Sequence, residues 1–425
     1  MPEPAPGEQY YRATSVADVY PPLRGAVDCA VCIVGAGFAG LGTAISLMER
    51  GLGDVVLLEA DTLGLGASGR NGGFVFGGFS LGERSLVDAV GVKNARELYR
   101  LTLDAVTLIR RRIKRYGIAC DAREEGVYLA NWFSDERILG RQQRFMADNL
   151  GVEWQRVGRL ELADRLLTAR YSGALFEPGA FHFHPLKYAR GLARVLAAGG
   201  VTLHEHSRAI RIAPDGKGWR VSSAHGAVRA REVVVCCGGY LERLSPRLAG
   251  AMLPIATYVM VTEPLGARMD GIMRTGAAVY DTRFAFDYYR PLADTRLLWG
   301  GRISVRERSA AAVARLLYRD MLRVYPQLAG ARVDYAWSGR MSYARHKMPQ
   351  LGRLPDGQWH ATGFGGHGVG GRPGRPVRRP ADVLVLRVAR SPARPPDQVS
   401  GWQHPRSGTR LRRFAALHPA CSAQW

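Results

Sequence analysis

A chain of 425 residues is too long for one hydrophobic core, so we expect two domains. Its hydrophobic fraction of 47% and charged fraction of 23% are ordinary for a globular protein, whereas its formal net charge of +22 is not. The basic residues are spread along the chain, and no zinc-finger or RNP-like pattern accompanies them. We therefore do not expect nucleic acid as a partner.

Other simple classes are also disfavoured. No stretch reaches the roughly 20 apolar residues of a membrane span, and the first twenty residues do not resemble a signal peptide. Six cysteines do not make a disulfide framework at this length, which favours a cytoplasmic protein. Cys29 and Cys32 form a C-x-x-C on an expected strand, where odd spacing directs side chains to opposite faces. The pair His182 and His184 lacks neighbouring carboxylates or thiols, so we predict no metal site.

The first strong signal is a strand, a glycine-rich turn and a helix. Residues 30–34 are an apolar run typical of a buried parallel strand. The next six residues read G-x-G-x-x-G, with glycines at Gly35, Gly37 and Gly40. A helical apolar pattern follows, and a second apolar run ends at the acidic residue Glu59. This order predicts a Rossmann-like fold that binds a dinucleotide.

Each part of the motif has a physical role. Gly35 makes a tight turn, Gly37 lets the backbone approach a pyrophosphate, and Gly40 lets the helix pack closely on the strand. The helix N-terminus offers N–H groups and a positive dipole end to the phosphates. Glu59 is placed to accept hydrogen bonds from ribose hydroxyls and would repel the extra phosphate of NADP.

The segment 63–73 distinguishes FAD from NAD. It is too rich in glycine for a helix interior and too polar for a strand, and Arg70 and Asn71 add specific hydrogen-bond donors. An NAD-dependent domain needs no such extended loop at this point. The sequence therefore favours FAD.

With these motifs the sequence resembles the D-amino-acid-oxidase-like family of FAD-dependent oxidoreductases, and within it the bacterial gamma-glutamylputrescine oxidase-like branch. The resemblance covers roughly residues 9–370. The segments that carry it are 66–73 (G-A-S-G-R-N-G-G), 183–188, 233–240, 287–290, 300–302, 337–339 and 363–369.

The resemblance implies an α/β fold with a discontinuous FAD-binding Rossmann-like domain of the glutathione-reductase type. A second, α+β substrate domain would be built on a mainly antiparallel sheet. The expected FAD contacts are Gly35, Gly37, Phe38, Ala39, Gly40, Glu59, Ala60, Ser68, Gly69, Arg70, Asn71, Gly72, Gly73, Cys237, Gly238, Gly365 and Gly366. Some relatives attach FAD through a cysteine in the region that matches residues 337–352. This chain has none there, so FAD is expected to be non-covalent.

The expected organisation follows from this resemblance and from periodicity. The segments are an N-terminal arm 1–27, the FAD-binding domain 28–83, 170–240 and 335–370, the substrate domain 84–169 and 241–334, and an atypical tail 371–425. Within the substrate domain, helical periodicity marks residues 92–116, 134–150 and 310–325, and strand-like patterns mark 253–264, 284–290 and 297–302.

The family implies oxidation of the C–N bond of an amine or amino acid, such as gamma-glutamylputrescine. Hydride would pass to flavin N5, the imine would be hydrolysed, and oxygen would reoxidise the flavin. A flavin dehydrogenase that passes electrons to a quinone is the alternative. A catalytically impaired FAD-binding protein is a further alternative, because of the tail.

A few residues are candidates for direct roles in this reaction. Tyr288, Tyr289 and Arg290, an aromatic pair with a charge on an expected strand, are candidates for the substrate pocket, although an ordinary sheet with a surface arginine explains them equally well. Arg302 would supply positive charge near the flavin, or is a solvated surface arginine. His367 lies in the loop that the resemblance places beside the isoalloxazine.

The composition changes abruptly after Val369. Residues 371–425 contain 11 Arg, no Lys, 2 Asp and 8 Pro, so they supply +9 of the net charge of +22. Prolines at the start of this tail prevent a regular helix, whereas the family pattern has a helix that points at the flavin. Our hypothesis is a shifted reading frame that begins near Gly370, and a natural disordered extension is the alternative.

Overall fold

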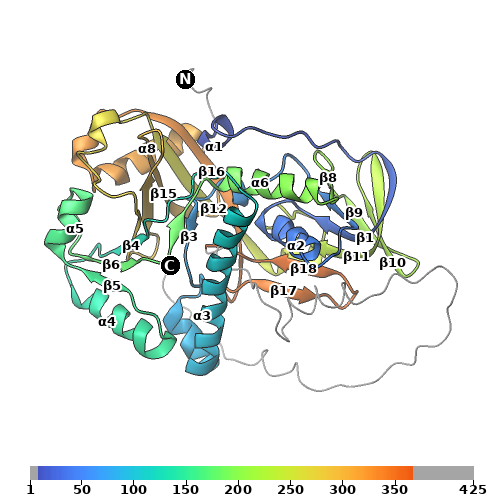
Figure 1. Cartoon of the computed structure of the whole chain (residues 1–425), viewed down its shortest axis with the longest axis horizontal. Coiled ribbons are helices and arrows are strands. Elements are labelled where there is room, and N and C mark those ends of the chain that lie inside the picture. The colour runs from blue at the N-terminus through green and yellow to red at the C-terminus, as the bar shows by residue number, and fades with distance from the viewer. Residues whose placement is uncertain (1–7, 367–425) are drawn as a thin grey trace. The chain divides into compact units, whose positions relative to one another are not determined.

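The computed structural model describes residues 8–366, and two eight-stranded sheets dominate this part of the chain (Figure 1). The predicted fold class, a Rossmann-like α/β sheet beside a mainly antiparallel one, is confirmed. His367 and the tail 371–425 lie outside the described residues, so the interpretation of the tail stays a hypothesis. The exact limits of the two domains also stay a prediction.

The first sheet has a parallel centre in the order β18-β11-β1-β2-β8. These strands are β1 (Gly25–Val34), β2 (Val55–Leu58), β8 (Thr202–His204), β11 (Gly226–Val235) and β18 (Trp359–Thr362). Antiparallel strands extend it: β17 (Gln350–Arg353) pairs with β18, β10 (Gly218–Ser222) pairs with β11, and β9 (Arg211–Asp215) pairs with β10.

Helices α2 (Phe38–Met48) and α6 (Pro185–Ala198) pack together against the first sheet (Figure 1). The last six residues of β1 are all buried, because this strand is covered on both faces. The turn between β1 and α2 is the predicted glycine motif. The predicted order of strand, turn, helix and strand is therefore confirmed.

The second sheet has the order β16-β12-β15-β14-β13-β4-β6-β5, and every neighbouring pair except β13 and β4 is antiparallel. Its strands are β4 (Val127–Ala130), β5 (Gln155–Val157), β6 (Ala174–Glu177), β12 (Met252–Thr262), β13 (Ala278–Asp281), β14 (Asp287–Pro291), β15 (Leu297–Ser304) and β16 (Val333–Ala344). Helix α8 (Ala310–Leu322) packs on one face, which we call the outer face. The other face, here called the inner face, meets residues of α1 (Tyr10–Ala13) and α6.

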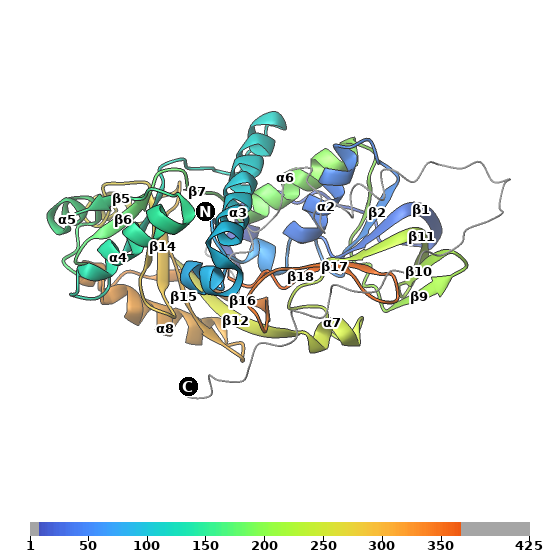
Figure 2. The ribbon, with the colours of Figure 1, turned by 90° about the horizontal axis from the view of Figure 1, so that it is seen from below.

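Helix α3 (Glu83–Arg115) lies between the two sheets (Figure 2). Its second half packs into the core of the first sheet through Val106 and Ile109, and Tyr99 packs into a cluster that includes Leu175 of the second sheet. The helix is broken at Gly91, whose φ is 75°. Within residues 8–366, no helix is long and apolar enough to span a membrane.

Smaller elements complete the described chain. They are η1 (Ala67–Gly69), β3 (Phe74–Val75), α4 (Arg137–Phe145), the π-helical turn η2 (Met146–Leu150), α5 (Arg159–Leu166), β7 (Phe181–His182), α7 (Pro246–Gly250), η3 (Gly266–Arg268) and η4 (Pro326–Leu328). The helices and strands predicted in the substrate domain are confirmed in type. The strand predicted from residue 284 begins only at Asp287.

One prediction about β1 is wrong. Cys29 and Cys32 do not face apart, because both belong to the cluster that includes Trp219. The alternation of faces breaks between Ala30 and Val31, which both pack into the core beneath α2. Both thiols are buried and free, and burial raises the pKa of Cys29 to about 12.

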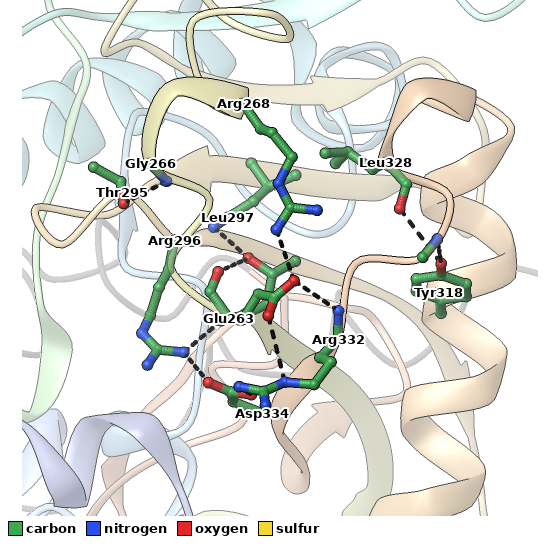
Figure 3. Close-up of polar contacts among 12 residues, drawn as sticks. Glu263, Gly266, Arg268, Thr295, Arg296, Leu297, Tyr318, Leu328, Arg332 and Asp334 are labelled. Carbon is green, nitrogen blue, oxygen red and sulfur yellow. Dashed lines mark hydrogen bonds and ion pairs between the residues drawn. The ribbon is translucent and has the colours of Figure 1, made fainter. Parts of the chain in front are cut away.

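Charged side chains join three strands at one end of the second sheet (Figure 3). Arg296 Nη1 lies 2.6 Å from Asp334 and also donates to the carbonyl of Thr262. Asp334 contacts Arg332, which in turn contacts Glu263. We call this group the Arg296 network. It links the ends of β12, β15 and β16 through paired charges.

Candidate functional site

A cavity of about 480 Å³ opens at the carboxyl ends of the parallel strands β1, β2 and β11. Its lining falls within residues 34–39, 58–61, 65–71, 208–210, 236–244, 340–342 and 361–366. This is the edge at which open α/β sheets bind their ligands, and the volume lies within the range of small-molecule and cofactor sites.

The turn after β1 has no room for larger residues. Gly35 has a φ of +99°, and a Cβ there would lie 3.2 Å from the backbone of Cys236. A Cβ at Gly40 would overlap the carbonyl oxygen of Gly35, and one at Gly37 would lie 2.8 Å from Ser68 Oγ. Because Gly37 has no side chain, its backbone is exposed to the cavity. This is the close approach that a pyrophosphate requires.

The N-terminus of α2 faces the same cavity. Gly37, Phe38 and Ala39 line it, and the N–H of Phe38 donates to Ser68 Oγ over 2.8 Å. The first N–H groups of a helix and its dipole favour an anion at this position. The turn thus fits the phosphates of a dinucleotide.

Glu59 lies at the end of β2 on the wall of the cavity. Its carboxylate accepts hydrogen bonds from the backbone N–H groups of Ala36 and Ala60, each over 2.8 Å, and of Asp61 over 3.1 Å. Burial raises the pKa of Glu59, and these N–H groups oppose the shift. A carboxylate accepts about four hydrogen bonds, so with three accepted the fixed group can still accept one from a ribose hydroxyl.

The loop 63–73 is held by its own polar side chains. Arg70 donates to the carbonyls of Leu65, over 2.7 Å, and of Ser338 in β16, over 3.2 Å. Asn71 donates to the carbonyl of Ser68 and accepts from the N–H of Gly73. Both side chains line the cavity. They shape the loop and join it to the second sheet.

Most of the predicted FAD contacts line this cavity, including Ala60, Cys237, Gly238, Gly365 and Gly366. Four predicted contacts lie outside the lining, namely Gly40, Gly69, Gly72 and Gly73. These glycines allow close packing instead. For example, a Cβ at Gly69 would lie too close to the carbonyl oxygen of Gly64, and one at Gly73 would meet Phe183.

Sequence reasoning missed several lining residues on the far wall. Tyr240 follows β11, its hydroxyl accepts from the N–H of Arg340, and the Arg340 guanidinium lies 5.4 Å from its ring. Arg208 also lines the cavity and pairs with Glu242 over 3.1 Å. Tyr240 could have been found, because it ends the motif 233–240. The arginines carry no signal in a sequence with so many of them.

The candidates on β14 face opposite sides of the second sheet. Tyr289 lies in the core of the outer face, where its ring stacks on Trp299 with centroids 4.4 Å apart. Tyr288 and Arg290 lie on the inner face, beside Gly72. Period-two alternation forbids all three from facing one pocket. Tyr289 is 0% exposed in the core of the outer face, so the structure gives its predicted contact with substrate no support.

Arg290 is not a surface arginine, since only 3% of it is exposed. Its guanidinium donates to the carbonyls of Gly72, over 2.6 Å, and of Phe183, over 2.9 Å, and to the hydroxyl of Tyr11. Its Nη1 also lies 3.3 Å from His182 Nδ1. Arg290 therefore holds the cofactor loop in position, and four of its five N–H donors bond to the protein itself.

Arg302 points away from the cavity. It makes two hydrogen bonds of 2.8 Å and 2.6 Å to the buried carboxylate of Asp320 in α8. Its backbone has a φ of +60°. Helix α8 lies on the outer face of the second sheet, so Arg302 is directed away from the cofactor cavity. The structure therefore gives no support to the prediction that Arg302 supplies positive charge beside the flavin.

The two histidines on either side of Phe183 have structural partners. Burial and the charge of Arg290 lower the pKa of His182 to about 3 and that of His184 to about 2. His184 Nδ1 accepts the N–H of Lys187 and thereby caps α6, and its Nε2 lies 3.0 Å from Thr14 Oγ1. Both rings are therefore expected to be neutral parts of the core.

Comparisons with known proteins agree with this geometry. The family model described as FAD dependent oxidoreductase matches residues 30–374. Gamma-glutamylputrescine oxidoreductase of Escherichia coli (strain K12) is 35% identical over 373 residues, which cover 85% of each chain. A probable oxidoreductase, OrdL, of Haemophilus influenzae is 33% identical and is covered over 81% of its length, against 82% of this chain.

Solved structures show the same fold. The crystal structure of glycine oxidase from Geobacillus kaustophilus superposes with a TM-score of 0.65 at 22% identity. The match covers 85% of this chain and 94% of that one.

Proposed function

Because the chain belongs to the FAD dependent oxidoreductase family, we propose that it oxidises the C–N bond of an amine or amino acid. FAD is the cofactor of this family, and when bound it supplies the hydride acceptor. The observation that carries the proposal is the cavity at the carboxyl ends of the strands, with its glycine turn and fixed carboxylate. The amine class is supported by the relative named gamma-glutamylputrescine oxidoreductase.

Different residues of the chain would bind different parts of FAD. Gly37, Phe38 and Ala39 would hold the pyrophosphate against the helix N-terminus. Glu59 would bind the ribose, and Ser68 and Asn71 would fix the loop beside the cofactor. Attachment would be non-covalent, because residues 337–352 contain no cysteine.

The finer parts of the proposal concern substrate, acceptor and location. We include a gamma-glutamylputrescine-like substrate, because the relative with that name matches most of both chains. Oxygen is the proposed acceptor, with a quinone as the alternative. A cytoplasmic location is also proposed, since the five cysteines in the described part of the chain are free.

A visible absorption spectrum of the full chain after incubation with FAD, followed by anaerobic addition of an amine panel, tests the proposal. The panel includes gamma-glutamylputrescine, glycine and a neutral amide. We expect a flavin spectrum that an amine bleaches, and hydrogen peroxide on readmission of air. Electron transfer to a quinone without peroxide would favour the dehydrogenase. A bound flavin that no amine or amino acid reduces would contradict the proposed reaction.

A matched pair of glycine variants tests the cofactor site. Gly37→Ala places a methyl group against Ser68 and in the path of the pyrophosphate, so FAD should bind about tenfold more weakly or worse. Gly53→Ala is the control, because its methyl group would lie 3.6 Å from the nearest atom. Equal FAD affinity of both variants, measured by flavin fluorescence, would exclude Gly37 from the site.

A further inference from the structure

Five aromatic side chains form a closed ring on the inner face of the second sheet. Phe74 contacts Tyr288 and Phe76, with centroids 5.4 Å and 6.3 Å apart. Tyr280 contacts Phe76 at 5.3 Å and Phe286 at 5.7 Å, and Phe286 returns to Tyr288 at 6.2 Å. All five are only half-buried. We call this group the aromatic ring.

The aromatic ring lies next to the cofactor loop. A methyl group added at Gly72 would strike the rings of both Tyr288 and Phe74. Gly72 directly follows Asn71, which lines the cofactor cavity. Tyr280 and Tyr288 are direct partners across β13 and β14, so they project from the same face of the sheet. The aromatic ring therefore lies beside the loop that would hold the cofactor.

A buried carboxylate, Glu177, belongs to the same face. It pairs with Val127 of β4, which in turn pairs with Ala278 of β13. Val127 and Ala278 pack against Phe74, Phe76 and Tyr280 of the aromatic ring. Because paired residues project from the same face of a sheet, the Glu177 side chain lies on the side of the aromatic ring.

Glu177 has an incomplete set of partners. Only 8% of it is exposed, and the N–H of Gly77 donates to its carboxylate. Its Oε2 has no hydrogen-bond partner within residues 8–366, and the same holds for the hydroxyl of Tyr99, which is 1% exposed. Burial raises the pKa of Tyr99, and the nearby charges of Glu177 and Glu83 add to the shift.

A buried carboxylate without a cation is costly, and such groups are normally paired. Burial raises the pKa of Glu177 to about 7, and the charge of Glu83 adds to the shift. Other buried carboxylates in this sheet are paired with arginine, as Asp281 is with Arg283 and Asp334 with Arg296. The missing partner of Glu177 is thus a cation that the described chain does not supply.

We propose that the aromatic ring and Glu177 bind the ammonium group of an unbranched alkylamine substrate. The inference rests on the proposed function and names the substrate class of that site. Aromatic faces attract a cation that they surround, and the ammonium group donates to Glu177 Oε2. The alkyl chain packs on the same rings.

The same face disfavours an α-amino acid as substrate. Binding an α-carboxylate requires a cation with donors to spare. The arginine that β14 presents on this face, Arg290, uses four of its five N–H donors on Gly72, Phe183, Tyr11 and His182, so it has no pair of donors left for a carboxylate. Among the described residues, this face is therefore more complementary to a cation than to a carboxylate.

Binding of n-butylammonium to the FAD-loaded full chain, measured anaerobically by calorimetry at pH 8, tests the inference. Glu177→Gln should weaken binding by about 10- to 100-fold, because it removes a charge-assisted hydrogen bond. Phe76→Leu should weaken it by about 3- to 10-fold through loss of one aromatic face. The affinity for 1-butanol, a neutral analogue of the same length, should change less than twofold in Glu177→Gln.

Two controls carry the same chemical changes elsewhere. Glu136→Gln alters a solvent-exposed carboxylate, and Phe133→Leu alters an exposed aromatic residue. Both should bind n-butylammonium as the unaltered chain does. Norleucine should bind more weakly than n-butylammonium, because Arg290 has no pair of donors left for its carboxylate.

Each outcome separates this inference from the proposed function. If amines reduce the flavin but Glu177→Gln and Phe76→Leu bind n-butylammonium normally, the substrate site is elsewhere and the function stands. If n-butylammonium binds in a Glu177-dependent manner but no amine reduces the flavin, the site stands and the function fails. Failure of n-butylammonium to bind the unaltered chain, or tighter binding of norleucine, would overturn the inference.

Discussion

Buried charged side chains of the second sheet lie in two different kinds of environment. In the Arg296 network, Arg296 is 4% exposed, its guanidinium lies 2.6 Å from Asp334, and further ion pairs surround it (Figure 3). At Glu177, no cation balances the carboxylate in the described part of the chain. The two regions differ in whether the protein itself completes the set of partners.

The difference indicates what each region is for. Paired buried charges compensate each other and hold strands in register, so their main effect is to define the structure. An unpaired buried carboxylate lowers stability and persists where a function requires it. The comparison therefore assigns the Arg296 network to the scaffold and Glu177 to ligand binding.

The largest expected effect comes from removing one member of the Arg296 network. Asp334→Ala leaves the buried Arg296 guanidinium with one ion pair, to Asp294 at 3.0 Å, and its hydrogen bond to the Thr262 carbonyl. We expect a loss of about 3 kcal/mol in the free energy of unfolding, measured in urea. Glu136→Ala, an exposed partner of Arg156, should change it by less than about 0.5 kcal/mol. Similar small losses in both variants would remove the contrast between the two regions.

At Glu177, in contrast, we expect a substitution to raise the free energy of unfolding. Its pKa in the folded chain is raised from 4.5 to about 7, so the folded state holds the proton more tightly than the unfolded state. Stability therefore falls as the pH rises from about 4.5 to about 7. Glutamine cannot ionise, so Glu177→Gln avoids the fall in stability that accompanies ionisation of the carboxyl group. We expect it to raise the free energy of unfolding by about 2 kcal/mol at pH 8 and by much less at pH 4.5.

Urea unfolding of the unaltered chain and of Glu177→Gln over this pH range measures the difference. Parallel pH profiles would mean that Glu177 has its ordinary pKa, and the contrast with the Arg296 network would then be lost.

The smallest expected effects come from substitutions of two neighbouring residues on β14, Tyr288 and Tyr289. Tyr289→Phe removes a hydroxyl that lies 3.4 Å from the hydroxyl of Tyr325 in the outer core, so stability should fall by about 1 kcal/mol without a change in amine affinity. Tyr288→Leu removes one face of the aromatic ring and should weaken n-butylammonium binding by about threefold. An effect of Tyr289→Phe on amine affinity would contradict the assignment of the two faces.

The sequence by itself determined the local parts of this protein. The turn at Gly35, Gly37 and Gly40 and the carboxylate of Glu59 were predictable, because strand, turn, helix and strand follow each other within about 30 residues in this motif. The family resemblance extended this to the fold class, which the structure confirms. These features depend on neighbours in the chain and on backbone conformations that only certain residues adopt.

Tertiary structure decided which distant residues share a face. Tyr288 and Tyr289 are alike in the sequence, and only the packing of α8 on the outer face of the second sheet separates their roles. Glu177 carries no signal in the sequence, because an acidic residue at the end of a strand normally faces water. Its burial results from the pairing of β6 with β4 and from the segment around Gly77 that covers it. Such contacts depend on strand order, which no local pattern specifies.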